Sequence, residues 1–291
     1  MKLKRLDGSK IFDIFNVLLI SLFTLIILVP ILNIVGSSFA SNEALAKGGF
    51  LFIPPAFSLD NYRAVLNDPT IVRAFFISVS KTVVGVITHV MFCAMVAYGL
   101  SKRHLKFRKL YTAMGVFTMY FSGGMIPYYL LIKDLGLRNS FLVYIIPALF
   151  SYYDVVILMN FFRQIPESLE ESATIDGAGY WTIFLRIILP LSKPSLATIA
   201  LFNGVNQWND FMTAKLYITD ETLYPLQMKL YEIIVQSQAA STNVVGSMVL
   251  ATTTKGIQLA TIVVTTVPIL IIYPLLQKHF VSGMMLGAVK E

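Results

Sequence analysis

The chain has 291 residues, of which 56% are hydrophobic and only 13% are charged. Soluble domains carry about 25% charged residues, so this composition excludes an ordinary soluble protein and indicates one embedded in a membrane. The net charge of +7 does not indicate nucleic acid, because the basic residues cluster in short segments beside apolar runs. The single cysteine, Cys93, excludes an intrachain disulfide and a Cys-x-x-Cys metal site.

Six apolar segments are long enough to cross a bilayer, whose hydrocarbon core of ~30 Å takes about 20 helical residues. They predict one all-α integral membrane domain over residues 11–277, preceded by a basic N-terminus (1–10) and followed by a tail (278–291). The six predicted spans are residues 11–35, 72–100, 110–132, 141–163, 191–213 and 256–277.

The first span follows a basic segment, as the apolar part of a signal peptide does. It is too long for that role, and Ser38-Phe39-Ala40 matches a cleavage site weakly. We therefore expect a retained membrane anchor rather than a removed signal.

The distribution of Lys and Arg predicts the orientation. Most of these residues fall in segments on the same side as the N-terminus, in particular in the loop 101–109. By the positive-inside rule, both termini and the loop 164–190 are then cytoplasmic. The two long segments 36–71 and 214–255 lie outside.

The loop 164–190 is a charged segment between two apolar runs. Glu167, Glu170 and Glu171 fall in the first turns of a predicted helix, where carboxylates interact favourably with the helix dipole. Gly177 and Gly179 allow a sharp reversal, and a second amphipathic helix follows over residues 180–189. Without further information, this could be a surface helix that contacts no partner.

The spacing of the loop is more specific. Glu171-Ser172-Ala173 is followed by three residues, Gly177, nine residues, and then Ile187, one residue and Leu189-Pro190. This resembles the EAA loop of bacterial ABC-importer permeases. The pattern of that loop has Ala at the position of Ser172, and this chain matches it at the other fixed positions. The resemblance implies a type I ABC importer permease fold, with six transmembrane helices and a cytoplasmic coupling helix.

The same resemblance implies that the helix docks in a cleft of a cytoplasmic ATPase. Glu171 would pair with a basic residue of the ATPase, and Gly177 would permit close approach. Three small or acidic residues would pack in the cleft, and the C-terminal tail would reach between the two ATPase subunits. The predicted coupling residues are Glu170, Glu171, Ser172, Ala173, Asp176, Gly177, Ala178 and Gly179.

Other segments are similar to the sugar-importing branch of this family, specifically to the second maltose permease and to LplC-like oligosaccharide permeases. They extend from the first outer loop to the C-terminus and include Pro54-Pro55 to Tyr62, Phe121 to Pro127, Asp134 to Leu137, Asn206 to Phe211, and Phe280 to Lys290. The implied partners are a homologous second permease, an ATPase homodimer, an extracytoplasmic sugar-binding protein and membrane lipid.

Polar residues within the predicted spans are candidates for a substrate path, because intramembrane polar groups are costly and therefore often functional. On the fifth span, residues 203, 206, 207 and 210 share one helical face. The candidate path residues on the fifth and fourth spans are Asn203, Asn206, Gln207, Trp208, Asn209, Asp210, Tyr152, Tyr153 and Asp154.

These residues also have a simpler interpretation. Asn and Gln often bond between packed membrane helices, and Tyr and Trp are common at the membrane interface. On the second span, Lys81 and His89 could also line the path, but the favoured interpretation is a snorkelling lysine and a helix-packing histidine. Asp154 and Asp210 are the only plausible buried carboxylates, and both are expected near helix ends.

The sequence lacks a Gly-x-x-x-x-Gly-Lys-Ser/Thr loop, which predicts that this chain does not bind ATP by itself. It also lacks a His-Glu-x-x-His motif, and we predict no metal site, no cofactor and no enzymatic activity in this chain. ATP and Mg²⁺ would be bound by the partner ATPase. The alternatives are an ion-coupled secondary transporter, which the loop spacing disfavours, and a membrane-embedded transferase, for which no cluster of catalytic residues is evident.

Overall fold

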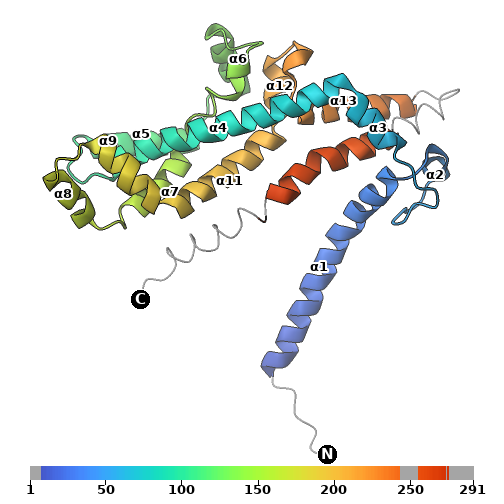
Figure 1. Ribbon diagram of the computed structural model, residues 1–291, viewed down its shortest axis with the longest axis horizontal. Coiled ribbons are helices and arrows are strands. Elements are labelled where there is room, and N and C mark those ends of the chain that lie inside the picture. The colour runs from blue at the N-terminus through green and yellow to red at the C-terminus, as the bar shows by residue number, and fades with distance from the viewer. Residues whose placement is uncertain (1–7, 243–254, 273, 275–291) are drawn as a thin grey trace, which may run out of the picture. The chain divides into compact units, whose positions relative to one another are not determined.

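The computed structural model describes residues 8–242, 255–272 and 274, and these are helices and connecting segments without a β-strand. The helices group into two compact units, residues 1–68 with 232–265 and residues 69–231 with 266–291. Figure 1 shows the helices in chain order. Each unit is described below by itself.

The first unit contains α1 (Gly8–Ser38), α2 (Asn42–Lys47) and α3 (Asp60–Asn67). The second unit contains the long helix α4 (Pro69–Ser101) and the helices that pack on it. These are α5 (Arg108–Tyr120), α6 (Met125–Asp134), η1 (Phe141–Tyr144), α7 (Tyr152–Phe162), α8 (Glu167–Ile175), α9 (Tyr180–Ile183), the π-helical η2 (Phe184–Ile188), α10 (Leu189–Leu191), α11 (Lys193–Asn209), α12 (Met212–Tyr217) and η3 (Glu221–Leu223). α13 (Leu226–Thr242) and a last helix (Lys255–Ile272) complete the described chain.

The described helices include three continuous segments that are long and apolar enough to cross a membrane, Phe12–Ser38, Pro69–Ser101 and Lys255–Ile272. They confirm helices at the predicted first, second and sixth spans, although residues 275–277 of the sixth lie outside the described residues. The fifth span is shorter than predicted, because α11 ends at Asn209. The preceding helix, Tyr180–Leu191, meets α11 at an angle of 80°.

Two of the predicted spans were wrong in their continuity. Residues 110–132 are not one helix, because the segment 121–124 separates α5 from α6 at an angle of 114°. Gly124 in this break has a φ of 89°, a conformation that side chains disfavour. Residues 141–163 form the short η1 and then only the 11 residues of α7, with Pro147, which has no N–H to donate, in the gap.

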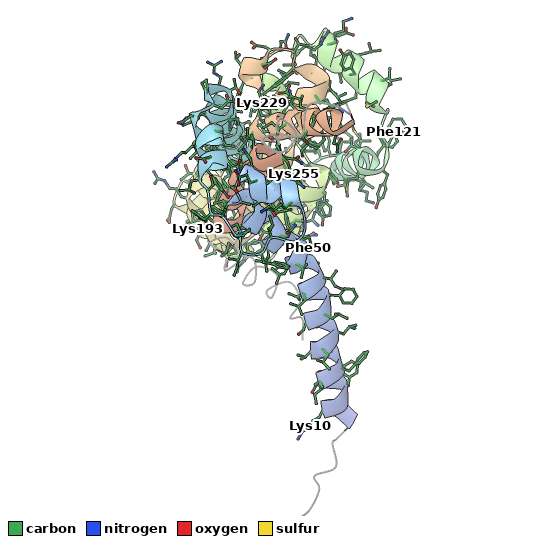
Figure 2. The ribbon with its side chains drawn as sticks, turned by 90° about the vertical axis from the view of Figure 1, so that its right-hand side faces the viewer. Lys10, Phe50, Phe121, Lys193, Lys229 and Lys255 are labelled. Atoms are coloured by element: carbon green, nitrogen blue, oxygen red, sulfur yellow. The ribbon has the colours of Figure 1, made fainter. Side chains whose placement is uncertain are left out.

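The apolar character of α1 extends around its whole circumference. Figure 2 shows its side chains projecting on all sides of the helix, and the window of highest hydropathy has no buried residue. A helix that is apolar all round requires an apolar environment. α1 is therefore suited to lipid or to packing against other membrane helices.

The core of the second unit lies where α4 packs against α7 and α11. Glycines allow two of the close approaches, as is common between membrane helices. A Cβ on Gly85 of α4 would lie 2.9 Å from the side chain of Gln207 on α11. A Cβ on Gly115 of α5 would lie 2.1 Å from the ring of Tyr152 on α7.

In the first unit, the segment after α1 is organised by two residues of α3. The Asn61 amide donates to the carbonyl oxygens of Ser38 and Ala40 at 3.3 and 3.1 Å. The Tyr62 hydroxyl lies 2.7 Å from the Ser38 hydroxyl, and the Tyr62 ring stacks on Phe39. The Ser58 hydroxyl accepts from the Asp60 amide at the start of α3.

Candidate functional site

The loop predicted to couple the chain to a partner forms two helices joined by a tight reversal. α8 begins after Pro166 and ends at Ile175, and Gly177 then adopts a φ of 81°. The Ala178 amide donates to the Ala173 carbonyl at 2.9 Å, and the Gly177 amide to the Thr174 carbonyl at 3.0 Å. This is a Schellman motif, so the predicted reversal is confirmed at Gly177.

Gly179 has no comparable role, because its φ is −78° and a Cβ there would contact nothing. The second predicted helix, residues 180–189, is also confirmed. It extends to Leu191 and contains one π-helical turn, Phe184–Ile188.

Ionic contacts attach one side of α8 to the end of α4. Glu170 forms an ion pair with Lys102 and accepts from the Tyr98 hydroxyl at 3.4 Å. The Lys102 ammonium also lies 4.1 Å from the centre of the Tyr98 ring. Arg103 and Glu167 form a second, more exposed pair at 3.1 Å. These contacts fix the orientation of α8 relative to α4.

A neighbouring part of the α8 surface is exposed. Glu171, Ser172 and Asp176 are exposed, whereas Ala173 and Ala178 are half-buried against the core of the same chain. Because these two alanines already have neighbours in this chain, they offer less surface to a partner than the resemblance implies. Their predicted place in an ATPase cleft stays a prediction.

One residue of this surface was missed by the sequence reasoning. Ile175 is 86% exposed and lies four residues after Glu171, on the same helical face. An isolated large apolar residue among polar ones at a helix end was the signal available in the sequence. The exposed face of α8 therefore combines a carboxylate with an aliphatic side chain.

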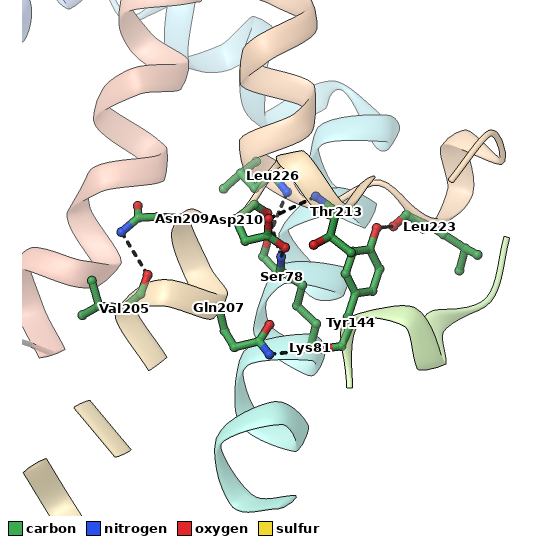
Figure 3. A network of polar contacts seen from close by, with 10 residues as sticks. All are labelled: Ser78, Lys81, Tyr144, Val205, Gln207, Asn209, Asp210, Thr213, Leu223 and Leu226. Atoms are coloured by element: carbon green, nitrogen blue, oxygen red, sulfur yellow. Dashed lines mark hydrogen bonds and ion pairs between the residues drawn. The ribbon is translucent and has the colours of Figure 1, made fainter. Parts of the chain in front are cut away.

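The second candidate site surrounds Lys81, which lies on α4 and is completely buried (Figure 3). Its ammonium donates to the backbone oxygen of Asp210 at 2.8 Å and lies 3.4 Å from the Asp210 carboxylate. The ring of Tyr144 is 4.8 Å away. The interpretation of Lys81 as a snorkelling lysine was wrong, because its ammonium is completely buried and the half-buried carboxylate of Asp210, 129 residues further along the chain, compensates its charge.

Further hydrogen bonds extend this network to the neighbouring segments (Figure 3). The Gln207 amide donates to the Tyr144 carbonyl at 3.0 Å, and the Tyr144 hydroxyl to the Leu223 carbonyl at 2.9 Å. The Asp210 carboxylate also accepts from the backbone amide of Thr213, in the first turn of α12. Gln207 and Asp210 thus join segments of the fold.

The other path residues on α11 differ in their surroundings. Asn203 is half-buried, and its side-chain oxygen has no hydrogen-bond partner within the part of the chain that the structure describes. Asn206 and Asn209 are exposed, whereas Trp208 is buried. Asn203 and Asn206 are therefore the residues of this set with polar groups available to a ligand, since Asn209 is bonded to Val205 and Gln227.

The path residues on α7 belong to a third polar group. The Asp154 carboxylate lies 3.0 Å from His89 Nε2, and His89 Nδ1 lies 2.7 Å from the Ala148 carbonyl. Because a carbonyl only accepts, Nδ1 carries a proton. His89 therefore packs α4 against the start of α7, as predicted. Tyr152 is buried, and Tyr153 is 59% exposed.

The described residues contain no group of three or more His, Cys, Asp or Glu side chains that could hold a metal ion. Together, these features define a helical membrane protein with one exposed helical loop for a partner and a polar interior.

Comparison with known proteins identifies the family. Residues 5–286 match the model of the binding-protein-dependent transport system inner membrane component. The chain belongs to this family and is an inner-membrane component of such a transport system, with the type I ABC importer permease fold.

Individual relatives cover nearly the whole chain. Protein LplC of Bacillus subtilis (strain 168) is 44% identical over 97% of this chain and 96% of its own. The polygalacturonan/rhamnogalacturonan transport system permease YtcP of the same organism is 41% identical over 97% and 99%. A chain of a bacterial ABC transporter that imports the acidic polysaccharide alginate superposes with a TM-score of 0.86, at 32% identity, over 96% of this chain and 100% of that chain.

Proposed function

We propose that this chain is a transmembrane permease subunit of an ATP-driven importer of oligosaccharides. It works with a homologous second permease, two ATPase subunits and an extracytoplasmic binding protein. The chain itself has no enzymatic activity and no cofactor, and the ATPase subunits bind ATP and Mg²⁺. Both termini and α8 lie in the cytoplasm, in agreement with the distribution of basic residues.

The observation that carries this proposal is the construction of α8. Its ion pairs to Lys102 and Arg103, which directly follow α4, connect it to a membrane-spanning helix, so a movement of α8 is passed to α4. Its exposed Glu171 and Ile175 are available to the ATPase. Closure of the ATPase dimer on ATP would displace α8 and reorient the spans, which is alternating access.

The substrate is proposed to be an acidic oligosaccharide. The relatives support this, since one is a polygalacturonan/rhamnogalacturonan transport system permease and another belongs to a transporter that imports the acidic polysaccharide alginate. The structure offers cations beside aromatic rings, and these cations could pair with the carboxylates of such a sugar. The Arg138 guanidinium lies 5.6 Å from the Tyr129 ring, and the Lys215 ammonium 4.4 Å from the Tyr231 ring.

The test is co-expression of the chain with candidate ATPase, permease and binding-protein partners, followed by reconstitution and measurement of ATP hydrolysis and uptake. We expect Glu171→Ala to assemble in the membrane but to lose most of the hydrolysis stimulated by loaded binding protein. Glu43→Ala removes an equal charge from another exposed helix start and is expected to behave as wild type. Normal transport by Glu171→Ala, or failure of the wild type to recruit an ATPase, would refute the proposal.

A further inference from the structure

A hollow of about 780 Å³ lies between the end of α4, the start of α5, the end of α7 and α8. Basic side chains dominate one part of its wall, and carboxylates from α8 line another. The basic residues that line it are Lys102, Arg103, His104, Arg108 and Arg163. Three carboxylates of α8, Glu167, Glu170 and Glu171, line the same hollow.

The carboxylates neutralise only two of these cations. Glu170 pairs with Lys102, and Glu167 pairs with Arg103. Arg108 and Arg163 form no ion pair within the described residues, and their positive charges are close enough to repel each other.

The contacts of Arg163 do not relieve this repulsion, because the hydrogen-bond partners of its guanidinium among the described residues are the neutral Leu100 carbonyl at 3.5 Å and the sulfur of Met159. An anion between Arg108 and Arg163 would do so. Guanidinium groups bind phosphate with paired hydrogen bonds.

A second hollow, of about 840 Å³, begins at the same place and extends along α5. Its basic end is formed by Arg103, Arg108 and Lys109, and its other end by Ala113, Val116 and Phe117. The Phe117 side chain is 60% exposed. The groove therefore changes from basic to apolar along a single helix, which matches the polarity of a molecule with an anionic head and a hydrocarbon chain.

We propose that these two hollows together bind an anionic phospholipid. The phosphate lies between Arg108 and Arg163, and an acyl chain lies along α5 toward Phe117. Basic pockets beside membrane helices on the cytoplasmic side commonly bind such head groups. A free phosphate would use the first hollow and leave the apolar groove empty, whereas the phospholipid fills both.

The site adjoins the contacts that hold α8. Arg103 lines both hollows and pairs with Glu167, and Lys102 and Glu170 line the first hollow. Glu171 and Ile175, the residues proposed to meet the ATPase, also line the first hollow. A bound lipid phosphate therefore changes the electrostatic field at the two ion pairs that orient α8. This consequence rests on the proposed function of α8, while the lipid site itself rests only on the residues that form it.

The test uses the full chain purified with its partner subunits in nanodiscs of phosphatidylcholine, to which fluorescent phosphatidylglycerol is added. We expect Arg108→Gln combined with Arg163→Gln to weaken binding of phosphatidylglycerol about 30-fold. Each removed charge contributes about fivefold, which corresponds to about 1 kcal/mol. The control, Arg73→Gln with Lys133→Gln, removes two exposed charges elsewhere and should leave binding unchanged. Equal loss in both variants would show a general charge effect and overturn the proposal.

A third variant tests the groove. Ala113→Trp fills the apolar end and should reduce phosphatidylglycerol binding without reducing the binding of inorganic phosphate. If Ala113→Trp has no effect on phosphatidylglycerol binding, the site binds a soluble anion and the phospholipid assignment fails. Lipid binding is measured without transport, so this outcome is independent of whether the importer function holds.

Discussion

The region around α8 and the network around Lys81 both join a lysine to a carboxylate, but in different surroundings. The side chains of Lys102 and Glu170 are 19% and 23% exposed, and they orient a helix whose other face is open. The Lys81 side chain is 0% exposed, and that of Asp210 is 28% exposed. The first pair positions a surface for a partner, whereas the second closes the interior between α4 and α11. Loss of the first should affect coupling, and loss of the second should affect folding.

The largest effect is expected for Asp210→Ala, which leaves the buried Lys81 without a compensating charge. Removing one partner of a buried pair typically costs about 3–5 kcal/mol, so we expect a large loss of folded protein. The measurement is the thermal unfolding midpoint of the purified chain in detergent. The variant Lys81→Met with Asp210→Leu removes both charges and should regain most of the loss. If Asp210→Ala unfolds at the wild-type temperature, the network does not stabilise the fold.

The contrast between these regions also explains what the sequence could predict. The α8 loop was predicted with its helix, its reversal and the following helix, because its signals lie within a few residues of one another. The environment of Lys81 was predicted wrongly, because its partner is 129 residues away and nothing local indicates the contact. The sequence spacing could predict that Asn203, Asn206, Gln207 and Asp210 share one helical face. It could not predict which of them is buried, because tertiary packing decides that.

The broken third span has a similar origin. Hydropathy is continuous from residue 110 to residue 132, and the composition alone cannot distinguish one helix from two. The signal that favoured a break was Ser122-Gly123-Gly124, since consecutive glycines disfavour a helix interior.

The second largest effect is expected at Gly115, where the interior tolerates no side chain. A leucine there would overlap the Tyr152 ring, which lies 2.1 Å from the position of a Cβ. Overpacking of this kind costs about 1–3 kcal/mol, so Gly115→Leu should lower the unfolding midpoint. Gly99→Ala is the control, because a Cβ at Gly99 meets nothing within 4 Å. Similar unfolding of both variants would contradict the observed packing of α5 on α7.

A smaller effect on folding but a clear one on coupling is expected for Ile175→Ala. The side chain is 86% exposed, so its removal should leave the unfolding midpoint unchanged. If it is buried in the ATPase, the lost methylenes contribute about 0.8 kcal/mol each, and ATPase association should weaken at least tenfold. Pull-down of the ATPase at graded concentrations measures this. Leu169→Ala, at a residue that is 43% exposed on the same helix, shows whether the effect is specific to the helix end.

The smallest effect is expected at Gly177, and it separates two explanations for this glycine. Its φ of 81° costs a residue with a Cβ about 1–2 kcal/mol, while a Cβ there would meet no atom of this chain. If the glycine serves only the reversal, Gly177→Asn should couple better than Gly177→Ala, because asparagine tolerates this conformation. If it serves close approach of the ATPase, both variants should lose ATPase association to a similar extent. The measurement is ATP hydrolysis stimulated by loaded binding protein, together with ATPase association, in each Gly177 variant. Gly179→Ala, at a glycine of ordinary φ, is the control with which both variants are compared.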